Sequence, residues 1–91
     1  MYKLITWDED KNDILKKQRW VCFEDIKVIM ESWNIVDLYE HHNKDKYPNQ
    51  KIIFVNIENY IYMIPFVEDK EKIFLKTIIP SRKYTKIFLN K

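Results

Sequence analysis

The stretch KIFLKTIIPSRKYTK, residues 72–86, joins an apolar segment to a basic one through a proline. Proline has no amide proton for a sheet ladder, so a strand over residues 72–79 should end at Pro80. Ser81 is a good helix N-cap, and the next apolar residues recur at the spacing of one helix face. These residues are Tyr84, Ile87 and Phe88. The stretch therefore predicts a last strand followed by a short C-terminal helix.

Arg82 and Lys83 would be the first residues of that helix. Free backbone N–H groups and the positive end of the helix dipole favour an anion there. A strand that delivers an Arg–Lys pair to a helix N-terminus is typical of a phosphate site. A solvated basic face on a docking helix accounts for the same residues equally well.

Charge is distributed unevenly along the 91 residues, although the net charge is only +2. Residues 72–91 contain six Lys or Arg and no acid, whereas residues 1–71 contain ten Lys or Arg and fourteen Asp or Glu. A basic block of this kind indicates a polyanionic partner. The length and the hydrophobic fraction of 46% predict one folded domain over residues 1–91.

Composition excludes several classes of site. Cys22 is the single cysteine, so neither an internal disulfide nor a cysteine-based zinc site is possible. The absence of glycine excludes a P-loop, a dinucleotide fingerprint and a nucleophile elbow, and leaves tight turns to Asn and Asp. No apolar run is long enough for a membrane span or a signal peptide, so we expect a cytoplasmic protein without a membrane partner.

The predicted fold class is α+β. A short N-terminal strand and two helices pack on a four-stranded antiparallel sheet, and a short helix ends the chain. Pro65 fits an edge or a bulge better than the middle of a regular strand, and Glu58–Asn59 has the length of a hairpin connection. The expected strands cover residues 4–7, 35–40, 51–57, 60–67 and 72–79, and the first two helices cover residues 9–18 and 23–33.

The polar segment 41–50 is a candidate functional loop because it is too long for a tight turn. His41, where a strand meets this loop, could act as a general acid or base, although a solvated loop histidine is commoner. Adjacent His41 and His42 point to opposite sides of an extended segment, so no metal site or other cofactor is expected. Tyr47, Tyr62 and Tyr84 could stack on single-stranded bases, and each could equally be a packing residue.

Several motifs along the chain together resemble the BrnT-like toxins of bacterial type II toxin–antitoxin systems. They are Trp7-Asp8, Val21-x-Phe23-Glu24-Asp25, Glu40-His41-x-Asn43-x-x-Lys46-Tyr47-Pro48-Asn49-Gln50, the run Pro65 to Asp69, and the run Phe74 to Lys83. Individually these motifs are weak, but their order along the chain is fairly specific.

The resemblance implies a RelE-like fold, metal-independent cleavage of free or ribosome-bound mRNA, and neutralisation by a ribbon-helix-helix antitoxin. Carried over by position, it matches Arg82 and Lys83 to the basic pair of these toxins. In our preferred interpretation Arg82, Lys83 and Lys76 hold the scissile phosphate, and His41 or a tyrosine moves protons. The predicted RNA-binding residues are Tyr47, Lys51, Tyr84 and Lys86.

Two positions depart from the BrnT-like pattern. Thr77 stands where such toxins place an arginine, five residues before Arg82, and Cys22 stands where a capping serine is usual. Lys76 is adjacent to Thr77, but on a regular strand it would face the other side of the sheet. A catalytically inactive RelE-like module that only binds its antitoxin, RNA or the ribosome therefore remains an alternative.

Overall fold

A long antiparallel hairpin forms the centre of the structure, a computed structural model that describes residues 3–40, 45–46 and 50–90. Its strands are β3 (Gln50–Ile57) and β4 (Tyr60–Glu68). The connection Glu58–Asn59 has φ angles of 51° and 64°, the pair of positive values that a type I′ turn requires. The two-residue hairpin connection predicted from the sequence is confirmed.

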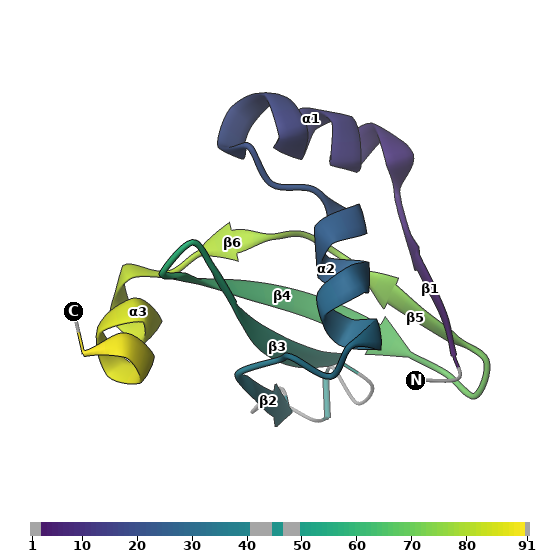
Figure 1. The fold of residues 1–91 in the computed structure, drawn as a ribbon. Coiled ribbons are helices and arrows are strands. Elements are labelled where there is room, and N and C mark those ends of the chain that lie inside the picture. Colours follow the sequence, from purple (N-terminus) through teal and green to yellow (C-terminus); the bar gives the residue numbers. More distant parts are fainter. Residues whose placement is uncertain (1–2, 41–44, 47–49, 91) are drawn as a thin grey trace.

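The sheet around this hairpin is mixed (Figure 1). Strand β2 (Asp37–Glu40) pairs antiparallel with β3, and β5 (Lys72–Leu75) pairs antiparallel with β4. Strand β1 (Leu4–Trp7) pairs with β5 in parallel, which gives the order β1-β5-β4-β3-β2. The four predicted antiparallel strands are therefore present as β2 to β5, but the prediction that the N-terminal strand lies outside a purely antiparallel sheet is wrong. The segment between β1 and β5 contains two helices and a hairpin, so it is long enough for the crossover that parallel pairing needs.

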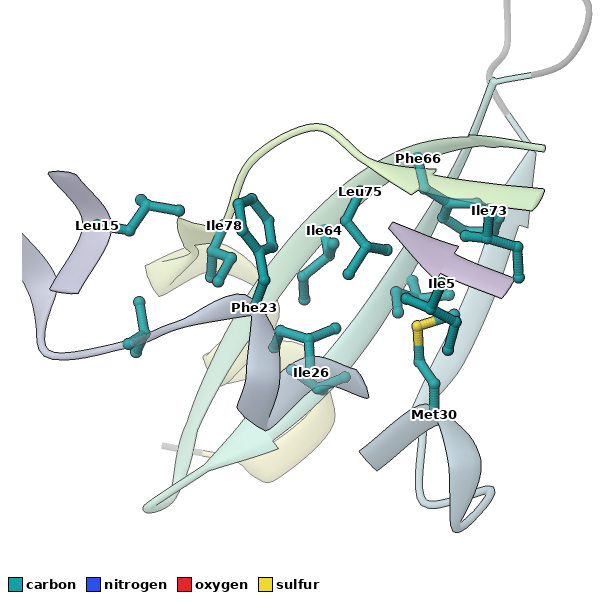
Figure 2. Close-up of a cluster of buried hydrophobic side chains, with 13 residues drawn as sticks. Ile5, Leu15, Phe23, Ile26, Met30, Ile64, Phe66, Ile73, Leu75 and Ile78 are labelled. Carbon is teal, nitrogen blue, oxygen red and sulfur yellow. The ribbon is translucent and has the colours of Figure 1, made fainter. Parts of the chain in front are cut away.

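Helices α1 (Glu9–Arg19) and α2 (Phe23–Glu31) lie over one side of the sheet, which we call the helix face (Figure 1). Figure 2 shows Phe23, Ile26 and Met30 of α2 packed over the sheet. Alternate residues of each strand point to this core. The buried strand residues of the core are Ile5, Ile53, Val55, Ile64, Phe66, Ile73 and Leu75. The structure is thus a small, compact α+β domain with a radius of gyration of 12.9 Å.

The opposite side of the sheet carries α3 (Arg82–Leu89), and we call it the α3 face. Phe54, between Ile53 and Val55 on β3, points to this side and lies 4.6 Å, centroid to centroid, from the ring of Tyr84. Helix α3 begins where it was predicted, with Ser81 as N-cap. Its buried side differs slightly from the predicted one, because Thr85 is buried whereas Ile87 is 55% exposed.

The N-terminus of α2 is capped from α1 rather than by its own N-cap residue. Cys22 occupies the N-cap position and makes no capping hydrogen bond. Instead the backbone N–H of Phe23 donates to Asn12 Oδ1 over 2.8 Å, and Asn12 Nδ2 donates to Glu24 Oε1 over 2.7 Å. Asn12 is completely buried, so one amide side chain fixes how α1 and α2 meet.

The predicted strand over residues 72–79 is interrupted by a β-bulge. Strand β5 ends at Leu75, opposite Phe66, and β6 (Ile79–Pro80) resumes opposite Met63. Three residues of this segment, 76–78, therefore face two residues of β4. The Lys76 N–H donates to the Pro65 carbonyl over 2.9 Å, and Pro65 has no N–H to return. Pro65 thus lies at a bulge, one of the two sites predicted for it.

Positive backbone φ angles occur at residues other than glycine, as a chain without glycine requires. Asn59 and Asn90 are the kind of residue predicted for such positions. Trp20 and Trp33 also have φ angles of 59°, next to the C-terminal ends of α1 and α2. Both indoles are largely exposed, at 92% and 68%.

Candidate nucleic-acid interface

The first turn of α3 presents cations and no acid. Ser81 Oγ accepts the Tyr84 N–H over 3.1 Å and caps the helix. Arg82 and Lys83, in the first turn, are both exposed. Lys86 is exposed one turn later, four residues after Arg82 and so on a neighbouring part of the helix surface. The three cations add to the positive end of the helix dipole, and this surface therefore attracts an anion.

Helix α3 is attached to β4 by side chain as well as backbone hydrogen bonds. The Ser81 N–H donates to the Ile61 carbonyl over 2.9 Å, which extends the ladder of β6 into the helix. In return the Ile61 N–H donates to Thr85 Oγ1 over 2.9 Å, and Thr85 Oγ1 donates to the Ser81 carbonyl over 2.6 Å. This network fixes where the basic turn lies on the α3 face.

An aromatic cluster lies beside the basic turn. Its members are Tyr39, Phe54, Tyr84 and Phe88. Tyr84 and Phe88 stack at 5.8 Å, and Lys83 Nζ lies 5.4 Å from the Tyr84 ring centroid. Tyr39, from β2, meets Phe54 edge-on at 4.8 Å and is 41% exposed. A cation over the half-buried Tyr84 ring, beside the exposed ring of Tyr39, is a suitable surface for the bases and phosphates of single-stranded RNA.

The hydroxyl of Tyr39 is held in its protonated form. Desolvation raises its pKa most, and the charges of Asp37 and Tyr84 raise that pKa further. At neutral pH this hydroxyl is protonated, as any ordinary tyrosine is, and it can donate a hydrogen bond; its raised pKa makes it a weaker acid. Sequence reasoning missed Tyr39. The alternation of apolar and polar residues in a short strand does not show which helix packs on each face of that strand.

Lys76 lies on the α3 face but apart from Arg82. The backbone N–H of Lys76 donates to the Pro65 carbonyl, whereas that of Ser81 donates to the Ile61 carbonyl. Pro65 and Ile61 are four residues apart on β4, a distance of about 13 Å along an extended strand. The Lys76 ammonium donates to Gln50 Oε1 over 3.2 Å. The structure therefore does not gather Lys76, Arg82 and Lys83 into a single cluster.

The other predicted residues lie either on the helix face or outside the described residues. Lys51 lies on the helix face, opposite Phe66, where its ammonium forms an ion pair with Glu68. Tyr62 also packs against the core on the helix face, so neither side chain points toward α3. His41 and Tyr47 lie outside the described residues, and their predicted roles stay predictions.

Residues 3–40, 45–46 and 50–90 contain no group of three or more His, Cys, Asp or Glu side chains that could hold a metal ion. Among the same residues, no helix has the length and apolar character needed to span a bilayer. Comparisons of the chain with protein-family models, with curated proteins and with solved structures gave no match.

Proposed function

We propose that this chain is a BrnT-like toxin of RelE-like fold, a cytoplasmic, metal-independent endoribonuclease that cleaves mRNA and is neutralised by a ribbon-helix-helix antitoxin. The observation that carries the proposal is the basic first turn of α3 beside the Tyr39–Tyr84 aromatic cluster. A phosphate fits the cationic turn while a neighbouring base stacks on an exposed ring.

In such a reaction the ribose 2′-oxygen attacks the phosphorus, and the 5′-oxygen leaves with a proton. Arg82 binds the phosphate in bidentate fashion and, with Lys83, stabilises the charge of the pentavalent phosphorane. Tyr39 lies in the aromatic cluster and is the tyrosine proposed to give a proton to the leaving 5′-oxygen. His41 keeps its proposed role as the group that takes the 2′ proton.

The bulge supports a role for Lys76. The bulge adds one residue to the segment between Leu75 and Ile79. If that extra residue were removed, Lys76 rather than Thr77 would be the fifth residue before Arg82. Lys76 would then occupy the place of the arginine of typical BrnT-like sequences. Its ammonium lies at Gln50 in this structure and would have to turn toward the RNA.

The second candidate function is a catalytically inactive module that binds an antitoxin, RNA or the ribosome. The separation of Lys76 from Arg82 favours it, because a preorganised site needs its cations around one phosphate.

Inducible expression with growth measurements and RNA 5′-end mapping separates the two functions. The variant Arg82→Lys keeps the charge and loses the bidentate fork, and we expect it to lose about a hundred- to thousandfold in cleavage rate. Lys17→Ala is the control, because it removes an exposed cation from α1, far along the chain from α3. New 5′ ends at equal rates in the wild type and Arg82→Lys would refute the catalytic assignment. No new 5′ ends in the wild type would favour the binding module.

A further inference from the structure

A hollow of about 640 Å³ lies on the helix face, away from the basic turn of α3. It is formed by the link between α1 and α2, the start of α2, and the β3–β4 hairpin. Its aromatic lining residues are Trp20, Tyr60 and Tyr62, and its charged ones are Arg19, Asp25 and Glu58. Its volume falls in the range of ordinary ligand sites.

The aromatic part of this hollow presents three electron-rich rings. Tyr60 and Tyr62 lie edge to face with their centroids 5.8 Å apart, and both are only partly buried. Trp20 is 92% exposed, so it contributes little to the core of this structure. An indole that projects into solvent beside two tyrosines is poorly explained by packing but well suited to binding a ligand.

The charges of the hollow select the kind of ligand. Asp25 and Glu58 are both exposed carboxylates, and the Cys22 thiol, a weak donor, donates to Asp25 Oδ2 over 3.2 Å. The guanidinium of Arg19 donates to the Ile78 carbonyl over 2.6 Å, so this cation is directed toward the bulge. The hollow therefore has two carboxylates and one cation, Arg19, which is already hydrogen-bonded to a carbonyl. This balance disfavours a phosphate ligand and favours a positively charged one.

We propose that this hollow binds an arginine side chain of a protein partner. The guanidinium would lie against the rings of Trp20 and Tyr60 and form an ion pair with Glu58 or Asp25. Rings supply attraction to the delocalised cation, and a carboxylate accepts its planar fork of N–H groups. The site lies on the helix face, whereas the proposed RNA site lies on the α3 face, so the two proposals stand independently.

The test is a titration of the full chain, followed by NMR, with the peptide acetyl-Ala-Arg-Ala-amide. The matched ligand control is the same peptide with citrulline, which keeps the shape of arginine and removes its charge. We expect the arginine peptide to shift the Trp20 indole and Tyr60 resonances, and the citrulline peptide to bind at least about threefold more weakly.

Two variants test the roles of the ring and the carboxylate. Trp20→Ala should abolish the peptide-induced shifts, and Glu58→Gln should weaken binding by about two- to fivefold. Trp33→Ala is the matched control, because Trp33 is also exposed, has the same φ angle, and follows α2 instead of α1. It should bind the peptide as the wild type does. Unchanged circular dichroism and melting temperature would show that each variant is folded.

The absence of shifts with the arginine peptide, or equal shifts with the citrulline peptide, would overturn the proposal. Shifts of the same resonances by the single-stranded hexanucleotide U6, displaced by salt, would assign the hollow to nucleic acid and overturn it as well. None of these results depends on whether the chain cleaves RNA.

Discussion

Replacing Asn12 by alanine should destabilise the fold more than any change at an exposed position of α1. The substitution removes the acceptor of the Phe23 N–H, a cap that is typically worth about 1 kcal/mol. Because that N–H is buried, it is left without a partner, and the same loss can then reach about 1–3 kcal/mol. We therefore expect a loss of about 1–3 kcal/mol, a large part of the 5–15 kcal/mol that is typical of a folded domain.

Urea denaturation followed by tryptophan fluorescence measures this loss. Trp7 stacks on Phe23 at 5.8 Å, so its emission reports the end of α2 that Asn12 caps. The control is Asp13→Ala, at the exposed neighbouring position, which should change the free energy of unfolding by less than about 0.5 kcal/mol. A similarly small change for Asn12→Ala would refute the argument that this amide joins the two helices.

A second substitution at the same position separates the two hydrogen bonds. Asn12→Asp keeps an oxygen for the Phe23 N–H but places a carboxylate against Glu24, where the amide donor stood. In the wild type, the hydrogen bond from Asn12 is the largest cause of the lowered pKa of Glu24. In Asn12→Asp the two acids raise each other's pKa, so the stability should be present at low pH and be lost as pH rises through the raised pKa. A destabilisation of Asn12→Asp relative to the wild type that does not grow as pH rises would contradict this reasoning.

Two further predictions concern hydrogen bonds and charge at the sheet. Thr85→Val keeps the shape but removes the acceptor of the Ile61 N–H, so it should lower the free energy of unfolding by about 1–3 kcal/mol, whereas Thr85→Ser should cost less. Hydrogen bonds from Lys3, and to a smaller extent from Lys51, lower the pKa of Glu68 in the folded protein. The stability that this carboxylate contributes is therefore present above its unfolded pKa of about 4.3 and is lost as pH falls through the lower folded pKa. Glu68→Gln should therefore flatten the decline in melting temperature on acidification, and an unchanged acid limb would count against the two ion pairs.

The parts of the fold that sequence reasoning predicted correctly are local in the chain. Ser81 caps Tyr84, three residues later, and Glu58–Asn59 connects strands that are adjacent in sequence. Such features depend on a few residues whose backbone preferences can be read directly.

The parts that were mispredicted or missed depend on distant partners. A four-residue strand such as Leu4–Trp7 has the same pattern in parallel or antiparallel pairing, and its partner β5 begins at Lys72. Asn12 looks like a surface residue of a weakly amphipathic helix, because its polar partners lie at the start of the next helix. Tyr39 joins the candidate site through contacts with Phe54 and α3, which no local pattern encodes.

The bulge between β5 and β6 also determines how this segment tolerates changes in length. Ile73 and Leu75 point to the core before the bulge, and Ile78 points there after it, although a strict alternation would turn Ile78 outward. Deleting Thr77 would restore the alternation and would still leave Ile79 opposite Met63, so α3 would keep its position. Two chains that differ by one residue at this point could therefore share one fold, and a sequence alignment that ignores the bulge would place every preceding residue on the wrong face of the sheet.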